Sequence, residues 1–278
     1  MTRAAAILPL WAALAAGQSL PLEPPHEAGS GITGAFEGWF KSSDGTFCLL
    51  LGYFNRNQKQ ELDIPIGPNN RIEPDGPDRG QPTHFLSGRQ WGMFVVKVPA
   101  DFGKNKITWT LTANGKATAI PASLNPDYEI SPLVEAAVGN TPPILRFEQN
   151  GSSVQGPAGM TVERSAAPGM PLTITVWVSD DAKFTSSSSA PPKNLPPPVR
   201  LRWSKFRGTG IVQFSNEKPP VEKIEDKSVA FSGKAVTTIT FSEPGDYVLH
   251  VVANDYSGEG GSGFQCCWTN AEVKVAVK

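Results

Sequence analysis

The chain has 278 residues, which is enough for two ordinary domains. Its 27 glycines and 26 prolines, set against only 18% charged residues, indicate many turns and few long helices. The formal net charge is -1 and the two signs are scattered, so the chain lacks the basic stripe that neutralises nucleic-acid phosphates. We therefore expect an all-β protein that does not bind nucleic acid.

The N-terminus carries a processing signal over residues 1–17. Arg3 precedes an apolar run of about a dozen residues, and small residues at 15–17 offer a cleavage site before Gln18. A membrane span needs about 20 apolar residues, so this run is too short to be one. A buried N-terminal helix is the alternative, but a proline interrupts the run. We predict export to the periplasm or exterior, with association with the cell surface as a further option. We also predict a flexible segment at 18–30 and no membrane span after processing.

Residues 31–140 are predicted to form a first β-sandwich. Asp44-Gly45 and Asn114-Gly115 each separate two apolar runs, a typical hairpin signal. The run at 93–99 alternates apolar and polar residues, as a half-buried strand does. Residues 63–90 are crowded with Pro, Gly, Asn and Asp, and we expect at most short edge strands in this long loop.

Residues 141–278 are predicted to form a second β-sandwich. A Ser/Pro-rich stretch at 181–198 cannot be a central strand, so it is expected to be a projecting loop. The apolar runs that predict the strands of this sandwich are 171–181, 199–214, 234–241, 246–255 and 271–278.

The second half resembles bacterial PKD-like or immunoglobulin-like extracellular domains. Trp203 stands where those domains have a core tryptophan, and Pro244-Gly245-Asp246-Tyr247 matches their corner before the penultimate strand. The first half resembles secreted bacterial proteins with no assigned activity. The resemblance implies two tandem immunoglobulin-like sandwiches after a signal peptide, and it supplies no catalytic residues.

The expected function is that of an exported, non-catalytic interaction or structural protein of the bacterial envelope or exterior, with a protein or polysaccharide partner. A carbohydrate-binding module is an alternative, because Trp39, Tyr53 and Trp91 bracket the long loop together with other aromatic residues, Phe40, Phe54 and Phe85. The competing interpretation is that these residues fill the core. Exposure of Trp39 and Trp91 side by side would favour binding, and burial would exclude it.

A third possibility is a glycoside hydrolase, which needs two converging carboxylates. The sequence has no nucleophile elbow, zinc-binding helix motif, phosphate loop or dinucleotide fingerprint. We therefore expect neither an enzyme nor a cofactor.

Carboxylates in glycine-rich loops raise the possibility of a calcium site. Asp255 and Glu259 form one such group, and a second consists of Glu73, Asp75 and Asp78. Solvated turn residues are the favoured explanation, with Asp255 capping a turn through its own side chain. His250 is expected on a strand surface.

Three cysteines leave three arrangements open. Cys266 and Cys267 can form a vicinal disulfide, one of them can pair with Cys48, or all can stay reduced. Neither a two-residue-spaced redox motif nor a zinc site is favoured. The cysteines are therefore expected to be structural.

Overall fold

The structure is a computed structural model that describes residues 26–42, 44–184, 195–257 and 266–278. It confirms the all-β prediction, since these residues form strands and a single 3-10 turn, Pro126–Tyr128, and contain no α-helix. No helix in the described ranges is long and apolar enough to cross a membrane. The predicted signal peptide lies outside these ranges.

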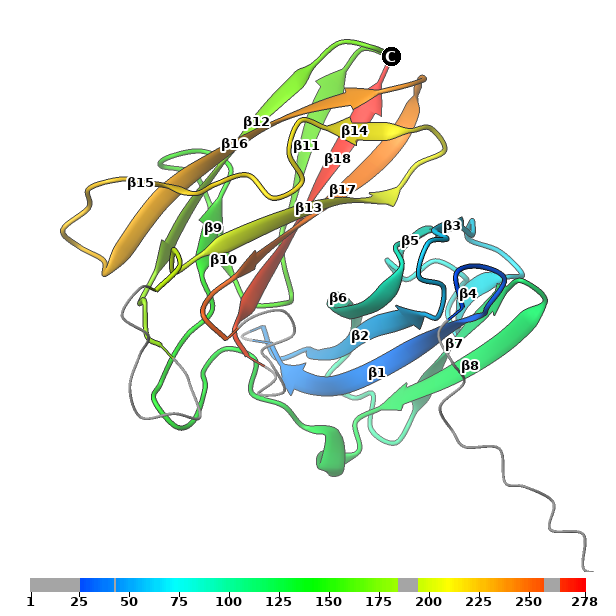
Figure 1. Cartoon of the computed structure of the whole chain (residues 1–278). Coiled ribbons are helices and arrows are strands. Elements are labelled where there is room, and N and C mark those ends of the chain that lie inside the picture. The colour runs from blue at the N-terminus through cyan, green and yellow to red at the C-terminus, as the bar shows by residue number, and fades with distance from the viewer. Residues whose placement is uncertain (1–25, 43, 185–194, 258–265) are drawn as a thin grey trace, which may run out of the picture.

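An N-terminal lobe, residues 26–130, packs two three-stranded sheets face to face (Figure 1). Asn114-Gly115 turns the chain between two paired strands of one sheet, as predicted, and both residues have positive φ. The strands of this lobe in the described residues are β1 (Ile32–Lys41), β2 (Phe47–Asn55) and β6 (Gly88–Val98) in one sheet, β4 (Asn70–Glu73), β7 (Lys106–Ala113) and β8 (Lys116–Ser123) in the other, and the short pair β3 (Leu62–Asp63) and β5 (His84–Phe85).

A C-terminal lobe, residues 141–278, is a second sandwich with its own cluster of buried side chains. One sheet, in spatial order, contains β10 (Ser153–Gln155), β9 (Ile144–Arg146), β12 (Leu172–Asp180), β16 (Phe231–Phe241) and β14 (Val212–Phe214), with β15 (Glu222–Lys223) also on β16. The other contains β11 (Thr161–Ala166), β18 (Trp268–Val277), β17 (Gly245–Asn254) and β13 (Arg200–Arg207).

This topology is immunoglobulin-like. The order β9, β12, β16, β14 follows the A-B-E-D sheet, and β13, β17, β18 follow the C-F-G sheet. Trp203 on β13 is buried in the core as expected. The Tyr247 hydroxyl donates to the Glu243 carbonyl over 2.9 Å, which is the tyrosine corner of this fold.

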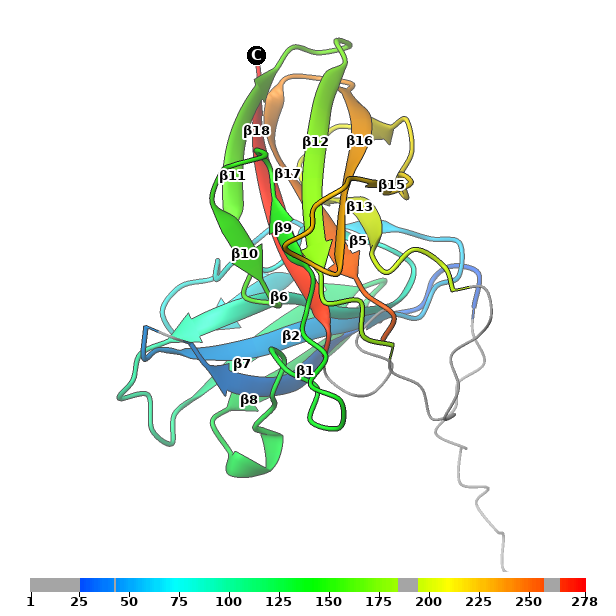
Figure 2. The same ribbon diagram turned by 90° about the vertical axis from the view of Figure 1, so that its left-hand side faces the viewer.

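The two lobes share buried side chains. Phe206 is the bulge residue of β13, between Lys205 and Arg207, and its side chain is buried in the core of the N-terminal lobe. On β18, Trp268 packs against N-terminal side chains that include Phe40 and Leu50. The C-terminal lobe stands over the N-terminal sheets (Figure 2), and these contacts fix it there. A domain boundary at residue 140 stays a prediction.

This docking corrects the prediction for His250. Strand alternation places His250 on the outer face of the β13–β17–β18 sheet, but the residue is only 1% exposed. Its ring lies 5.6 Å from that of Phe206, because the N-terminal lobe covers this face. Burial lowers the pKa of His250 to about 4.

The long loop at 63–90 contains only short strands, as predicted, and it touches the C-terminal lobe. Thr83 donates its backbone N–H to the Phe206 carbonyl over 3.0 Å, and Arg207 bonds the Asp78 carboxylate. Residues 26–30, expected to be flexible, lie against residues 57–60 through bonds such as Ser30 N to Asn57 Oδ1. The loop therefore holds the lobes together.

Candidate binding face and interlobe cleft

The three predicted carbohydrate-binding aromatics are not exposed together. Trp39 is 8% exposed and Tyr53 is fully buried, whereas Trp91 is 46% exposed. Trp39 donates its indole N–H to the Asn125 carbonyl over 2.7 Å, and Tyr53 accepts the Leu86 N–H over 2.8 Å. Trp39 and Tyr53 are thus core residues with satisfied polar atoms. The prediction that they form part of an exposed sugar-binding surface is wrong.

Trp91 instead belongs to a surface row that we call the arginine-aromatic face: Phe54, Arg56, Arg89 and Trp91. Phe54 on β2 lies directly opposite Arg89 on β6. The Arg89 guanidinium carbon is 3.9 Å from the Trp91 ring centroid, and that of Arg56 is 5.3 Å from the Phe54 centroid. Both pairs are within cation–π range, so guanidinium groups and rings alternate along the surface.

Partly buried polar contacts hold Arg89 in place. Its Nη2 donates to Glu37 Oε1 over 2.6 Å, and its Nη1 donates to the carbonyls of Tyr53 and Gln90 over 3.0 and 2.7 Å. Burial raises the pKa of Glu37, and the neighbouring Arg89 charge opposes that rise. The Arg89 guanidinium is therefore held by four groups: the Glu37 carboxylate, the carbonyls of Tyr53 and Gln90, and the Trp91 ring.

Glu37 reaches Arg89 because β2 has no side chain between them. Glu37 occupies a bulge of β1 between Phe36 and Gly38, and its carboxylate passes over Gly52. A Cβ at Gly52 would overlap Glu37 Oε1 and the Gln90 carbonyl. The other carboxylate oxygen accepts the Gly92 N–H over 2.7 Å, so Glu37 ties β1 to β6.

The face meets the C-terminal lobe at a small cavity of about 30 Å³. Trp91 and Gln90 line it from β6, and Arg202, Val252 and Trp268 line it from the other lobe. Arg202 therefore borders the face at this cavity.

A larger cleft of about 350 Å³ lies between the loop 63–90 and β13, and it contains His84. His84 Nδ1 is 2.9 Å from Asp63 Oδ1, its Nε2 is 3.1 Å from Glu61 Oε2, and Lys205 Nζ is 3.2 Å from Asp63 Oδ1. The group links the two lobes, because Lys205 belongs to β13 and the other three residues belong to the N-terminal lobe.

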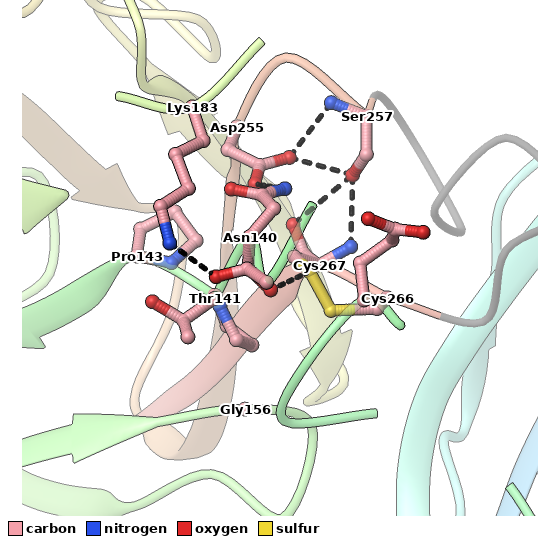
Figure 3. The surroundings of a disulfide bond; sticks show 12 residues. Asn140, Thr141, Pro143, Gly156, Lys183, Asp255, Ser257, Cys266 and Cys267 are labelled. Carbon is pink, nitrogen blue, oxygen red and sulfur yellow. Dashed lines mark hydrogen bonds between the residues drawn. A yellow bond between two sulfur atoms is a disulfide. The ribbon is translucent and has the colours of Figure 1, made fainter. Parts of the chain in front are cut away.

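The cysteine question is answered by a vicinal disulfide between Cys266 and Cys267 (Figure 3). Both residues are buried, and the Cys267 N–H donates to Ser257 Oγ over 2.8 Å. Cys48 is a free, buried thiol in the cluster that contains Trp268. A bridge from Cys48 to either partner is therefore excluded in this structure, and the disulfide belongs to the entry into β18.

The predicted calcium residue Asp255 caps a turn, as anticipated, by accepting the Ser257 N–H over 2.8 Å. It is buried rather than solvated, because Asn140 also donates to it, over 2.6 Å (Figure 3). Glu259 lies outside the described residues. Within the described ranges, no three His, Cys, Asp or Glu side chains are grouped so that they could hold a metal ion. Calcium binding at Asp255 stays a prediction.

The other acidic loop consists of surface turn residues. Glu73, Asp75 and Asp78 are exposed. Glu73 pairs with Arg71, Asp75 with Arg79 and Asp78 with Arg207.

A buried carboxyl group lies at the same end of the sandwich as Asp255. Asp180 is 6% exposed, and one of its oxygens, Oδ2, has no hydrogen-bond partner among the described residues. Burial, assisted by the charges of Asp255 and Asp181, raises the pKa of Asp180 to about 7. This group can therefore change its charge near neutral pH.

Comparison with known proteins identifies no family. No family model matches the chain, and no curated protein does either. Among solved structures, similarity extends to the D00-D0 domain of intimin (14% identity, 88% of this chain, 99% of that chain, TM-score 0.24) and to domains 4 and 5 of the S-layer protein SbsC (11%, 79%, 97%, TM-score 0.24).

A family 123 glycoside hydrolase from Clostridium perfringens also matches, at 11% identity and a TM-score of 0.23, over 42% of this chain. The chain spans 23% of the length of that hydrolase. Superpositions this loose carry no argument about the function of the chain.

Sequence reasoning missed Arg56, Arg89 and Glu37. A signal was present, since an arginine stands two residues from each exposed ring, Arg56 after Phe54 and Arg89 before Trp91. That spacing puts arginine and ring on one strand face. The pairing of β2 with β6, which makes one row of them, is not visible in either segment alone.

Proposed function

We propose that the chain is an exported, non-catalytic interaction protein whose contact surface is the arginine-aromatic face. The observation that carries this proposal is the position of Trp91, which is 46% exposed while Arg89 is fixed against its ring. Tryptophan and arginine are the residues most enriched among those that dominate binding energy at interfaces. A large ring left in solvent and held in one orientation suits recognition.

The rigid junction between the lobes supports the same proposal. Phe206 and Trp268 anchor the C-terminal lobe on the N-terminal sheets, and Arg202 reaches the edge of the face from that lobe. A binding surface built on strands and backed by a second sandwich loses little entropy when a partner binds. The proposal of export rests on the predicted signal peptide. We therefore expect the exported chain to begin at Gln18, and its intact mass would report this.

The test is capture of envelope polysaccharide and protein fractions from the source cells by the mature chain. A Phe54→Ala/Trp91→Ala double variant is expected to lose the material that the unchanged chain retains. Tyr128→Ala is the matched control, because Tyr128 is a 51% exposed ring elsewhere on the N-terminal lobe. Equal capture by all three proteins would refute the proposed contact surface.

A further inference from the structure

We infer that the partner of the arginine-aromatic face is an acidic saccharide, a chain of sugar rings that bear carboxylate or sulfate groups. This inference rests on the proposed function and adds the chemical class of the ligand. Two properties of the face support it: exposed flat rings and, next to them, an excess of guanidinium groups.

The rings supply surface for sugars. Phe54 is 38% exposed and Trp91 is 46% exposed, and both lie on the outer side of the β2–β6 pair. The face of a pyranose ring that bears its axial C–H groups is apolar, so it loses contact with water when it packs on an aromatic ring. Two rings along one strand pair therefore provide an elongated surface that suits a linear chain of sugars.

The arginines supply the charge. Arg56 and Arg89 bring two positive charges to the face, and the Glu37 carboxylate offsets one of them, which leaves an excess of one guanidinium. Arg56 has no ion pair with any described residue. A planar guanidinium donates two parallel hydrogen bonds to a carboxylate or sulfate, a geometry that lysine cannot match.

Two carboxylates of the neighbouring cleft have contacts of their own. Glu61 and Asp63 lie in the neighbouring cleft, where His84 contacts both and Lys205 contacts Asp63. A nucleic acid would also stack on rings and pair with arginines. The chain as a whole has a net charge of -1, however, and lacks the extended basic groove that tracks a phosphate backbone. The saccharide is therefore the favoured anion.

Isothermal titration of the mature chain with four probes tests the inference. The probes are hexagalacturonate, its fully methyl-esterified form, a chondroitin sulfate hexasaccharide and a dodecamer of deoxythymidylate. We expect at least one of the two anionic saccharides to bind, and the esterified chain, which differs from hexagalacturonate only in charge, to bind about tenfold more weakly or worse than its acid form if the carboxylate is the ligand. Raising salt from about 50 to about 500 mM is expected to weaken the binding of the anionic saccharide and to leave the binding of the uncharged ester unchanged.

Substitutions locate the binding to the face. Trp91→Ala is expected to weaken binding about tenfold or more, and Arg56→Gln about threefold to tenfold. Tyr128→Ala and Arg200→Gln, an exposed arginine at the start of β13, serve as controls and are expected to stay within about twofold. Far-ultraviolet circular dichroism and the thermal midpoint show whether each variant is folded.

The outcomes separate the inference from the function on which it rests. Equal binding of the acid and ester forms, with loss in Trp91→Ala, would overturn charge recognition while keeping the face as a saccharide site. Binding of the deoxythymidylate alone, or of none of the probes, would overturn the saccharide inference and leave the capture experiment to judge the face. Saccharide binding that Trp91→Ala and Arg56→Gln do not change would place the site elsewhere and overturn it as well.

Discussion

Two strand faces of this molecule have the same pattern in sequence and opposite environments in space. His250 and Trp91 both point outward from their own sheets, yet His250 is 1% exposed and Trp91 is 46% exposed. The outer face of β17 is covered by the N-terminal lobe, and the Trp91 end of β6 lies at the edge of that cover. Alternation along a strand thus identifies a face but not what lies over it.

The contents of the two faces fit their environments. Phe206 and His250 pack together in the covered face, where burial favours the neutral imidazole. The open face instead carries charged guanidinium groups on its rings. The first face stabilises the fold and the second is exposed to solvent, so substitutions in the two should differ in kind.

The largest expected effect comes from two matched phenylalanine substitutions. Phe206→Ala removes a fully buried ring and should lower the free energy of unfolding by about 3–5 kcal/mol. Phe54→Ala removes a ring that is 38% exposed and should cost less than about 1.5 kcal/mol. Denaturant unfolding followed by fluorescence measures both. Equal costs would mean that Phe206 does not anchor the lobes.

The next effect is a dependence of stability on pH. The folded pKa of Asp180 is raised to about 7 from 3.8, so the native state holds this proton longer than the unfolded chain. Its contribution to stability is complete below about pH 4 and is lost as the pH rises to about 7. Relative to Asp180→Asn, the unchanged protein should lose on the order of 3 kcal/mol across this interval.

His250 should oppose that trend over the same interval. Its folded pKa is depressed to about 4 from 6.5, so its contribution is present above about pH 6.5 and is lost as the pH falls to about 4. Removing Asp180 should therefore reveal a protein that weakens on acidification. Chemical denaturation of both proteins at pH 4, 5.5 and 7 checks the sign, and parallel profiles would show that Asp180 titrates normally.

A smaller effect is expected from Gly52→Ala, which tests how the open face is held. The added methyl group would overlap Glu37 Oε1 and the Gln90 carbonyl, so the free energy of unfolding should fall by about 1–3 kcal/mol. Arg89 should also lose its contact with Glu37, and tryptophan fluorescence should change. Glu37→Gln removes the charge without the overlap. Glu37→Gln should therefore lower the free energy of unfolding less than Gly52→Ala does. Equal losses in the two variants would show that the overlap is not the cause.

The last prediction concerns the number of free thiols rather than stability. The chain has three cysteines, and one disulfide joins two of them. Thiol titration in denaturant should give one thiol per chain without reductant and three after reduction. In the folded protein, buried Cys48 should react slowly. Three reactive thiols in the unreduced, exported protein would contradict the vicinal pair.

Local patterns predicted much of the fold. Asn114-Gly115 and the alternation in 93–99 placed a hairpin and a strand correctly, because turn type and side-chain period are local properties. Trp203 and Tyr247 likewise took the positions that the immunoglobulin-like resemblance implied. These features need no knowledge of distant contacts.

The candidate site was predicted only in part, because it depends on contacts between distant segments. Trp91 is exposed, whereas Trp39 and Tyr53 proved to be buried, since the inward faces of β1 and β2 contain rings as large as the outward ones. Arg89 meets Glu37 across 52 residues, over a glycine on a third segment. The burial of His250 depends on Phe206, whose bulge no strand pattern indicates.

Oxidative footprinting of Trp91 tests the central claim most directly. Hydroxyl-radical labelling of the mature chain, alone and with its captured partner, reports the solvent access of each ring by mass spectrometry. We predict that the partner lowers the oxidation of Trp91, while Tyr128, which is exposed elsewhere, and Trp39, which is buried, keep their rates. Oxidation of Trp91 at the same rate in the complex would show that the partner binds another surface.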